Sequence, residues 1–179
     1  MGRSFTVKST ESQGSNMYQI NDIVVYKSNG VCKIEDIGIP EFVSSEETYY
    51  QIRPFYEQGG KIYVKISNGD TVLRPTITKE EAMQDLLNLK TEEGIYHSND
   101  KVREREYTAI MQSCNFWKCL LMMKGILGES DRREAAGKHL NMTDERCLQR
   151  VKKLLNAEYS IACDVSLENA KEAMELALI

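Results

Sequence analysis

The apolar pattern of this chain changes its period near Pro75, and that change limits the possible folds more than any other feature. Between Met17 and Arg74, short runs rich in Val, Ile, Tyr and Thr alternate with turn-forming residues, which is typical of β-strands. After Pro75, apolar residues recur at intervals of three and four, which is typical of helices. The sequence therefore predicts an α+β protein, with a small β-barrel followed by an all-helical bundle.

The barrel part is expected to contain five short strands. Asn29-Gly30 should form a tight hairpin between the first two strands, because both residues tolerate positive φ. Five strands at this spacing favour an SH3-like or Tudor-like barrel. The expected strands cover residues 22–27, 31–37, 48–54, 61–66 and 71–74, and the later turns are Gly38 to Pro40, Gly59-Gly60 and Asn68-Gly69.

Capping residues mark the expected helices. Thr78 and Glu81 form a capping box that should start a helix ending near Leu89. A second helix is expected from about Ser98, with Tyr107, Ile110, Met111 and Cys114 on one face, and a third should carry Trp117, Leu120, Leu121 and Lys124 and end at Gly128. A fourth helix is expected over residues 131–139. Two more should follow N-terminal caps at Thr143 and Ser166.

These patterns divide the chain into four parts. Residues 1–16 show almost no apolar pattern and are expected to be a flexible extension, or an artefact of the start site or of cloning. Residues 17–76 should form the barrel, residues 77–100 a helix and a linker, and residues 101–179 the helical domain.

Composition excludes several classes of protein. Of 179 residues, 41% are hydrophobic, which is enough for a core. No run of 18 apolar residues and no signal peptide occurs, so the sequence predicts a soluble, cytoplasmic protein. The five cysteines are never spaced as C-x-x-C, which indicates reduced, mostly buried thiols and neither a metal site nor a cofactor.

Catalytic motifs are sparse. His97 and His139 are the two histidines, and no H-E-x-x-H, G-x-S-x-G, P-loop or G-x-G-x-x-G motif occurs. A pairing of one cysteine with one histidine is arithmetically possible, so a thiol-dependent enzyme remains a remote alternative. The sequence otherwise predicts a protein that is not an enzyme.

Charge is distributed unevenly along the chain. Residues 17–90 carry 8 Lys/Arg and 11 Asp/Glu, a net charge of −3, which suits nucleic acid poorly. Residues 101–153 carry 12 Lys/Arg and 7 Asp/Glu, a net charge of +5, whereas residues 154–179 carry 1 and 5, a net charge of −4. The basic helices either present one face to phosphates or simply expose solvated cations.

Several stretches match a known family. They are Ile20 to Tyr26, Gly30-Val31, Ile34-x-x-Ile37, Tyr49 to Ile52, Ile62 to Ile66 and Leu73-Arg74-Pro75. From Met17 to about Leu178 the chain resembles the CarD family, also called CarD-like or CdnL, in the form found in clostridial bacteria. A similar N-terminal domain occurs in the transcription-repair coupling factor, a much larger ATPase.

The resemblance implies a bacterial transcription regulator whose N-terminal barrel binds the β subunit of RNA polymerase. In the family, an edge strand of the barrel lies beside a strand of the polymerase, and this contact uses main-chain hydrogen bonds. The residues that correspond to the polymerase contact and its neighbouring strands are Ile34, Ile37, Ile39, Tyr49, Gln51, Arg53 and Lys65.

The resemblance also implies that the helical domain contacts promoter DNA at the upstream edge of the transcription bubble, with little sequence preference. The DNA-contact candidates are Tyr96, Lys101, Arg103, Arg105, Lys118, Lys124, Arg150 and Lys153. Relatives use a Trp as a wedge in the minor groove, but here Arg103 occupies that position and cannot unstack bases as an apolar ring does. Trp117 lies at helical spacing with Leu120 and Leu121 and is expected in the core.

We therefore expect a monomeric regulator of transcription initiation that has no enzymatic activity and stabilises the open promoter complex. The alternative is a polymerase-binding adaptor whose helical domain contacts protein and not DNA.

Overall fold

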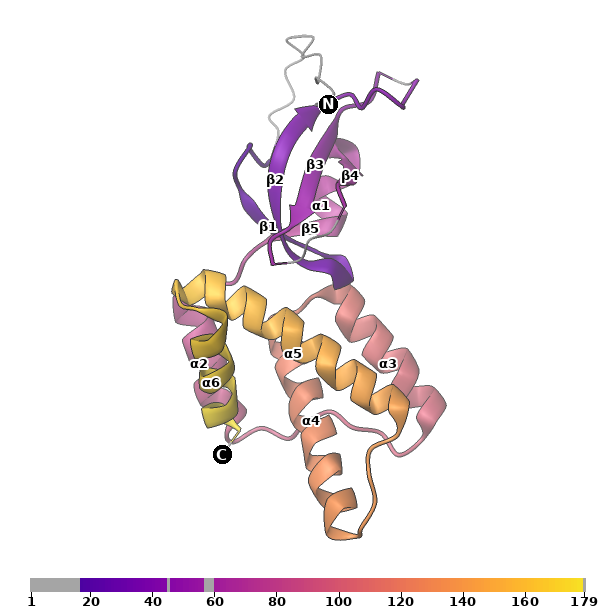
Figure 1. Cartoon of the computed structure of the whole chain (residues 1–179), viewed down its shortest axis with the longest axis vertical. Coiled ribbons are helices and arrows are strands. Elements are labelled where there is room, and N and C mark those ends of the chain that lie inside the picture. Colours follow the sequence, from indigo (N-terminus) through magenta and orange to yellow (C-terminus); the bar gives the residue numbers. More distant parts are fainter. Residues whose placement is uncertain (1–16, 45, 57–59, 179) are drawn as a thin grey trace. The chain divides into compact units, whose positions relative to one another are not determined.

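The computed structural model describes residues 17–44, 46–56 and 60–178. Contacts divide this part of the chain into two compact units. The β unit comprises residues 17–26 and 31–75, and the helical unit comprises residues 27–30 and 76–178. The predicted α+β class is confirmed (Figure 1). The predicted extension over residues 1–16 and the predicted turn residue Gly59 lie outside the described residues.

The β unit is a curled sheet of five strands. Its spatial order is β4-β3-β2-β1-β5, so β4 and β5 are the two edges of the described sheet. The predicted barrel is therefore open, and its SH3-like or Tudor-like character stays a prediction. The strands are β1 (Ile23–Tyr26), β2 (Gly30–Gly38), β3 (Tyr49–Pro54), β4 (Ile62–Lys65) and β5 (Leu73–Pro75).

Two predicted turns are wrong in detail. The loop after β1 is a 3-10 turn, η1 (Lys27–Asn29), with positive φ at Lys27 and Gly30, so Asn29-Gly30 is not a two-residue hairpin loop. The predicted turn and strand at 68–74 contain η2 (Ile66–Asn68) and the short helix α1 (Gly69–Val72) before β5 begins. Gly69 has a right-handed helical backbone, so nothing forces a reversal there.

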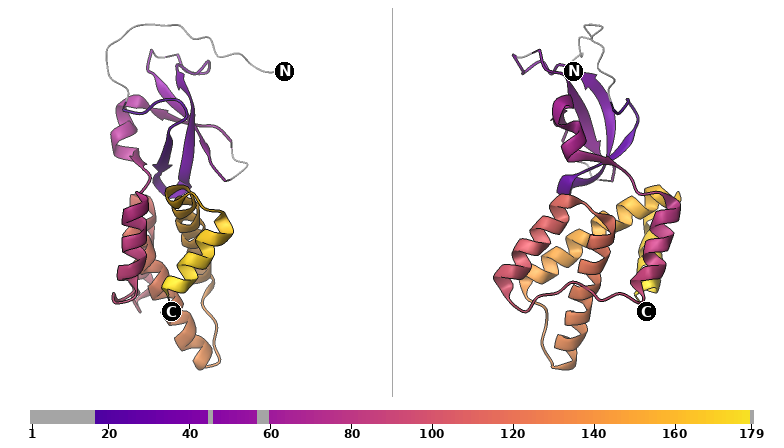
Figure 2. Two further views of the ribbon diagram at one scale, coloured as in Figure 1. Left: turned by 90° about the vertical axis from the view of Figure 1, so that its left-hand side faces the viewer. Right: turned by 180° about the vertical axis from the view of Figure 1, so that it is seen from behind.

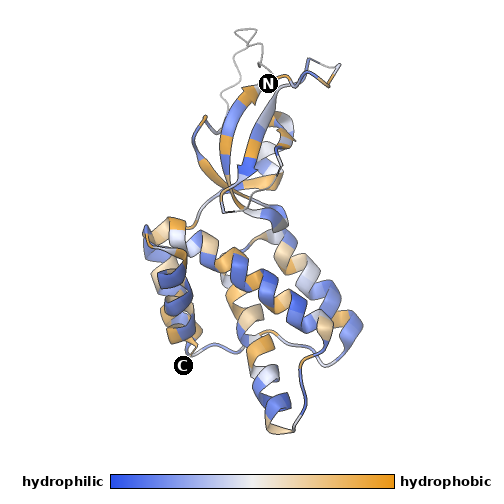
Figure 3. Cartoon of the chain, in the orientation of Figure 1, coloured by the Kyte–Doolittle hydropathy of each residue, from blue (hydrophilic) through white to orange (hydrophobic). Residues whose placement is uncertain are grey.

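Alternating side chains give β3 and the later part of β2 one apolar and one polar face, whereas successive residues are buried in β1 and at the start of β2. Cys32, Ile34, Ile52 and Val64 point inward and pack with other buried residues of the β unit. The alternation of apolar and polar residues along β2 and β3 is visible in Figure 3. One buried face and one polar face are typical of an antiparallel sheet, and they fix its register.

The helical unit contains five long helices. The capping box at Thr78 is confirmed, since its side chain accepts from the Glu81 amide and the Glu81 carboxylate accepts from the Thr78 amide. The predicted cap at Ser166 is also confirmed. The helices are α2 (Lys79–Leu89), α3 (Asp100–Ser113), α4 (Phe116–Ala135), α5 (Met142–Cys163) and α6 (Leu167–Ala177).

Two predicted helix boundaries are wrong. Gly128 does not end a helix, because α4 continues to Ala135 and the predicted helix over 131–139 is largely its last turns. Glu129 pairs with both Arg132 and Arg133 across this stretch, which stabilises the helix beyond the glycine. The cap of α5 is Asn141 and not Thr143, since the Asn141 side chain accepts from the Asp144 amide.

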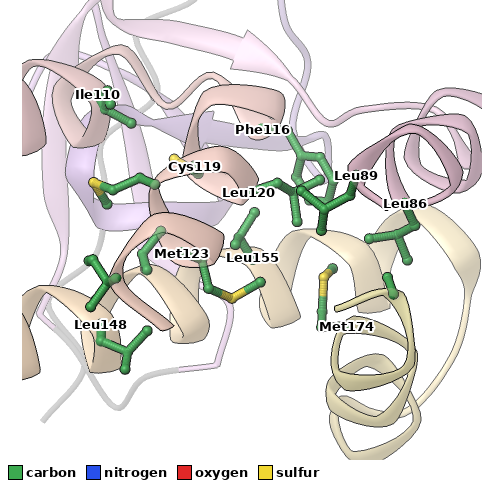
Figure 4. Packing of buried hydrophobic residues seen from close by; sticks show 14 of the residues in the cluster. Leu86, Leu89, Ile110, Phe116, Cys119, Leu120, Met123, Leu148, Leu155 and Met174 are labelled. Atoms are coloured by element: carbon green, nitrogen blue, oxygen red, sulfur yellow. The ribbon is translucent and has the colours of Figure 1, made fainter. Parts of the chain in front are cut away.

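One apolar core joins all the long helices of this unit. Figure 4 shows Leu89 of α2, Leu120 of α4, Leu155 of α5 and Met174 of α6 turned toward one another. Helices α2 and α6, far apart in sequence, pack against each other and against α5 (Figure 2). Residues 77–89 therefore belong to the helical unit, although the sequence suggested a helix set apart by a linker.

The segment before α3 crosses α4 with main chain against main chain. The Ile95 amide donates to the Leu121 carbonyl at 2.8 Å. A Cβ placed on Gly125 would lie 2.2 Å from the Ile95 carbonyl oxygen, and a Cβ on Gly94 would lie 2.3 Å from the Gly125 nitrogen. Only hydrogen at these two positions permits the crossing.

We predict that Gly125→Ala lowers the free energy of unfolding by about 2 kcal/mol or more, because the added methyl group meets backbone that cannot move aside. Gly128→Ala in the same helix is the matched control, since a Cβ there meets nothing within 4 Å. The control should raise stability by about 0.5–1 kcal/mol. Urea denaturation followed by circular dichroism measures both, and equal stabilities would contradict the close crossing.

Candidate functional site

The edge strand β4 exposes part of its main chain. It pairs antiparallel with β3, with Tyr49 opposite Lys65 and Gln51 opposite Tyr63. The Ile66 amide donates to the Thr48 carbonyl at 3.0 Å, which makes that pair a hydrogen-bonded one. Because hydrogen-bonded and non-bonded pairs alternate, the amides of Tyr63 and Lys65 point away from β3. Within the described sheet they point toward the outer edge, where a further strand would pair.

The outer face of the sheet beside this edge is a polar network. Glu35 of β2 accepts from Arg53 at 2.6 Å and from Gln51 at 3.1 Å. Gln51 in turn accepts from Lys61 at 3.2 Å and from the Tyr63 hydroxyl at 3.4 Å. The hydrogen bond from Arg53 lowers the pKa of Glu35. This ladder ties β4 through β3 to β2 and fixes the position of the open edge.

Lys65 lies at the end of this edge. Its ammonium group is 2.6 Å from the Glu47 carboxylate, and the hydrogen bond to Glu47 raises the pKa of Lys65. Its side chain is 41% exposed. Tyr49, Gln51 and Arg53 of β3 share the outer face with Lys65, so the structure brings four of the seven polymerase-contact candidates together.

The isoleucine candidates do not belong to this surface. Ile34 is fully buried in the core of the β unit, which contradicts its expected contact with a partner. Ile37 is partly buried against the same core, because a register shift between Ile34 and Asp36 displaces the alternation of β2 by one residue. Ile39 follows the end of β2 and is exposed.

Exposed cations on the helical unit are the second set of candidate residues, called the DNA surface below. Lys101 and Arg105 are one turn apart on α3, and both are exposed. The other exposed candidates are Lys118 of α4 and Arg150 and Lys153 of α5. This surface has the chemistry required for phosphate contacts without base recognition.

Arg103, however, is buried, with 3% of its surface exposed. It donates to Asp144 and to Asp100, each at 2.8 Å, and to the His97 carbonyl at 2.7 Å. Burial alone would lower the pKa of Arg103, but the hydrogen bonds to the two carboxylates raise it. The expectation that Arg103 contacts DNA is therefore wrong, because its guanidinium group is engaged inside the helical unit.

Two more DNA candidates have internal roles. Tyr96 is partly buried, its ring lies 4.7 Å from the Arg103 guanidinium carbon, and its hydroxyl donates to Asp144 at 3.2 Å. Lys124 is partly buried and donates to the Leu89 carbonyl at 2.5 Å, which caps the end of α2. Trp117 packs against the helical core, as predicted.

The central partner of Arg103, the buried Asp144, was not identified from the sequence. It also accepts from the Asn141 side chain at 2.8 Å, so its two oxygens hold three elements together. The signal was present, since Asp144 lies four and seven residues before the buried Leu148 and Val151. An inward acid at helical spacing predicts a buried partner of opposite charge.

The cysteines of this chain are mostly buried. Four of the five cysteines are buried. Burial raises the pKa of the fifth thiol, that of Cys147, which keeps it protonated and weakly nucleophilic. Among the described residues, no group of three or more His, Cys, Asp and Glu side chains could hold a metal ion.

The described chain thus combines a small sheet, whose edge strand β4 is braced by side-chain hydrogen bonds, with helices that carry exposed cations. Residues 18–77 match the family of the CarD-like/TRCF RID domain, which spans the whole β unit described above. Domains of this family interact with the β subunit of RNA polymerase. No curated protein matches the chain.

None of the helices in the described part of the chain is both long enough and apolar enough to span a bilayer.

We predict that Arg103→Ala destabilises the protein by about 3–5 kcal/mol, because it leaves the buried Asp144 carboxylate without its cation. Arg105→Ala, two residues along α3 and exposed, should change stability by less than about 0.5 kcal/mol. Thermal and urea unfolding measure both variants. A stable Arg103→Ala protein would show that the guanidinium group is not an internal tie.

Proposed function

We propose that this chain regulates transcription initiation by docking on the β subunit of RNA polymerase through β4 and contacting promoter DNA through the exposed cations of its helical unit. The observation that carries the docking half is the open edge of β4, in a domain of a polymerase-interacting family. Strand addition requires unpaired main-chain donors and acceptors, which β4 offers at Tyr63 and Lys65.

The DNA half rests on the exposed cations. After the internal roles of Arg103, Tyr96 and Lys124 are set aside, the proposed contacts are Lys101, Arg105, Lys118, Arg150 and Lys153. Their side chains neutralise phosphates without reading bases, which favours contact with upstream-fork DNA of any sequence. Such contacts would stabilise the open complex by charge, without a wedge residue.

Lys65→Pro tests the docking edge. Proline removes the outward amide and fits here, because Lys65 has a φ of −58° and no intrasheet bond from that amide is expected from the register. We predict that Lys65→Pro weakens binding to RNA polymerase at least tenfold in a pull-down or calorimetric titration.

Lys65→Ala is its control, because it removes the same side chain and keeps the amide. It should lose no more than about threefold in affinity, since an exposed ion pair contributes little. Equal binding by wild type and both variants would exclude β4 as the docking strand.

Charge reversal tests the DNA surface. We predict that Lys101→Glu combined with Arg105→Glu reduces the slope of log affinity against log salt by about 2 for fork-junction DNA bound with polymerase, and shortens the lifetime of the open complex. The control, Lys79→Glu combined with Lys171→Glu, makes the same change of charge on α2 and α6 and should leave the slope unchanged.

A second candidate is an adaptor whose helical unit binds protein instead of DNA. The burial of Arg103 at the position of the family's wedge favours it, because no aromatic side chain is presented there. If the charge reversal leaves both the salt slope and the open-complex lifetime unchanged while polymerase binding persists, the adaptor is the correct description.

A further inference from the structure

We propose that Phe42 is an aromatic anchor that determines which extended segment can join β4. The inference rests on the proposed polymerase docking and adds a side-chain requirement to it. Phe42 lies in the segment between β2 and β3 and is 71% exposed, the highest value among the large apolar residues described. Its ring stands edge-to-face on that of Tyr63 in β4, with centroids 5.0 Å apart.

A hydrogen bond closes the turn that carries Phe42. The Val43 amide donates to the Pro40 carbonyl at 3.0 Å, which closes a turn around Phe42, and Pro40 is itself buried. Further along, Glu47 pairs with Lys65, and the Thr48 carbonyl accepts from Ile66. A side chain presented by a fixed turn loses little conformational entropy when a partner covers it.

Phe42 contacts Tyr63, and the orientation of Tyr63 in β4 determines what Phe42 can contact. Tyr63 directs its side chain to the outer face, where its hydroxyl reaches Gln51, and directs its amide to the open edge. A strand added along β4 would place one side chain opposite Tyr63 on that outer face, about 4.5–5.5 Å away between Cβ atoms. That side chain would meet both the Tyr63 and the Phe42 rings.

The chemistry of this contact selects an apolar partner residue. Two rings in edge-to-face contact, one of them largely exposed, offer apolar area and carry no charge themselves, so an aliphatic or aromatic side chain would be stabilised there and a charged one would lose hydration. The proposed occupant is therefore an extended segment of the polymerase β subunit whose residue opposite Tyr63 is apolar. Main-chain hydrogen bonds to β4 would contribute affinity for an added strand of any sequence. Contact with Phe42 would favour strands that place an apolar side chain opposite Tyr63.

Phe42→Ala tests the inference in the full chain, with purified RNA polymerase as the probe. We expect at least a tenfold loss of affinity, with partial recovery in Phe42→Leu, which restores apolar area without the ring. The matched control is Phe55→Ala. Phe55 is also exposed, at 40%, and also stands edge-to-face on a tyrosine, with centroids 4.9 Å apart, but that tyrosine is Tyr56, outside β4.

The outcomes separate the anchor from the docking itself. Control binding within twofold of wild type and unfolding midpoints within about 2 °C for all variants would support the anchor. If wild type binds polymerase, Lys65→Pro does not, and Phe42→Ala binds as tightly as wild type, the anchor is overturned and the docking edge stands. If wild type itself does not bind polymerase, the proposed function fails.

Discussion

The buried ion pair between Arg103 and Asp144 is the constraint on which the helical unit depends. A guanidinium group removed from water is tolerated only when every strong donor direction finds an acceptor, and Arg103 finds two carboxylates and a carbonyl. These contacts tie the segment at His97, the start of α3 and the start of α5 together. The crossing of Gly94 over Gly125 brings the same segment against α4.

Because Arg103 is paired with Asp144 inside the helical unit, the net charge of residues 101–153 overstates the charge that a phosphate can reach. The net charge of +5 over residues 101–153 is a property of the sequence, whereas a phosphate meets only side chains that can reach it. Arg103 is buried, Lys124 caps a helix, and Arg132 and Arg133 both pair with Glu129. The cationic surface is therefore smaller than the sequence suggests.

Interactions between residues close in sequence, such as helix caps, could be predicted from the sequence. Contacts between residues far apart in sequence could not, and these determine which candidate site residues are buried. The Thr78 capping box and the Ser166 cap are formed by residues three apart, so the sequence contains both partners. The predicted end of the helix at Gly128 was wrong, because the ion pairs of Glu129 with Arg132 and Arg133 in the next turn outweigh the weak helix preference of glycine. The partner of Arg103 lies 41 residues away, and only the shared period of Arg103 with Tyr107 and Ile110 indicated that it faces inward.

A weak DNA surface is sufficient for a protein that is already bound to polymerase. In the proposed function, docking through one unit would turn DNA contact by the other into an intramolecular step, for which a tether supplies an effective concentration of roughly millimolar. A few exposed cations can then hold DNA that they would not bind from solution. The acidic β unit fits this division of work, because main-chain pairing at β4 needs geometry and not positive charge. In this proposal, selectivity for the partner comes from side chains beside the edge, such as Phe42 and Tyr63, whose rings are in contact.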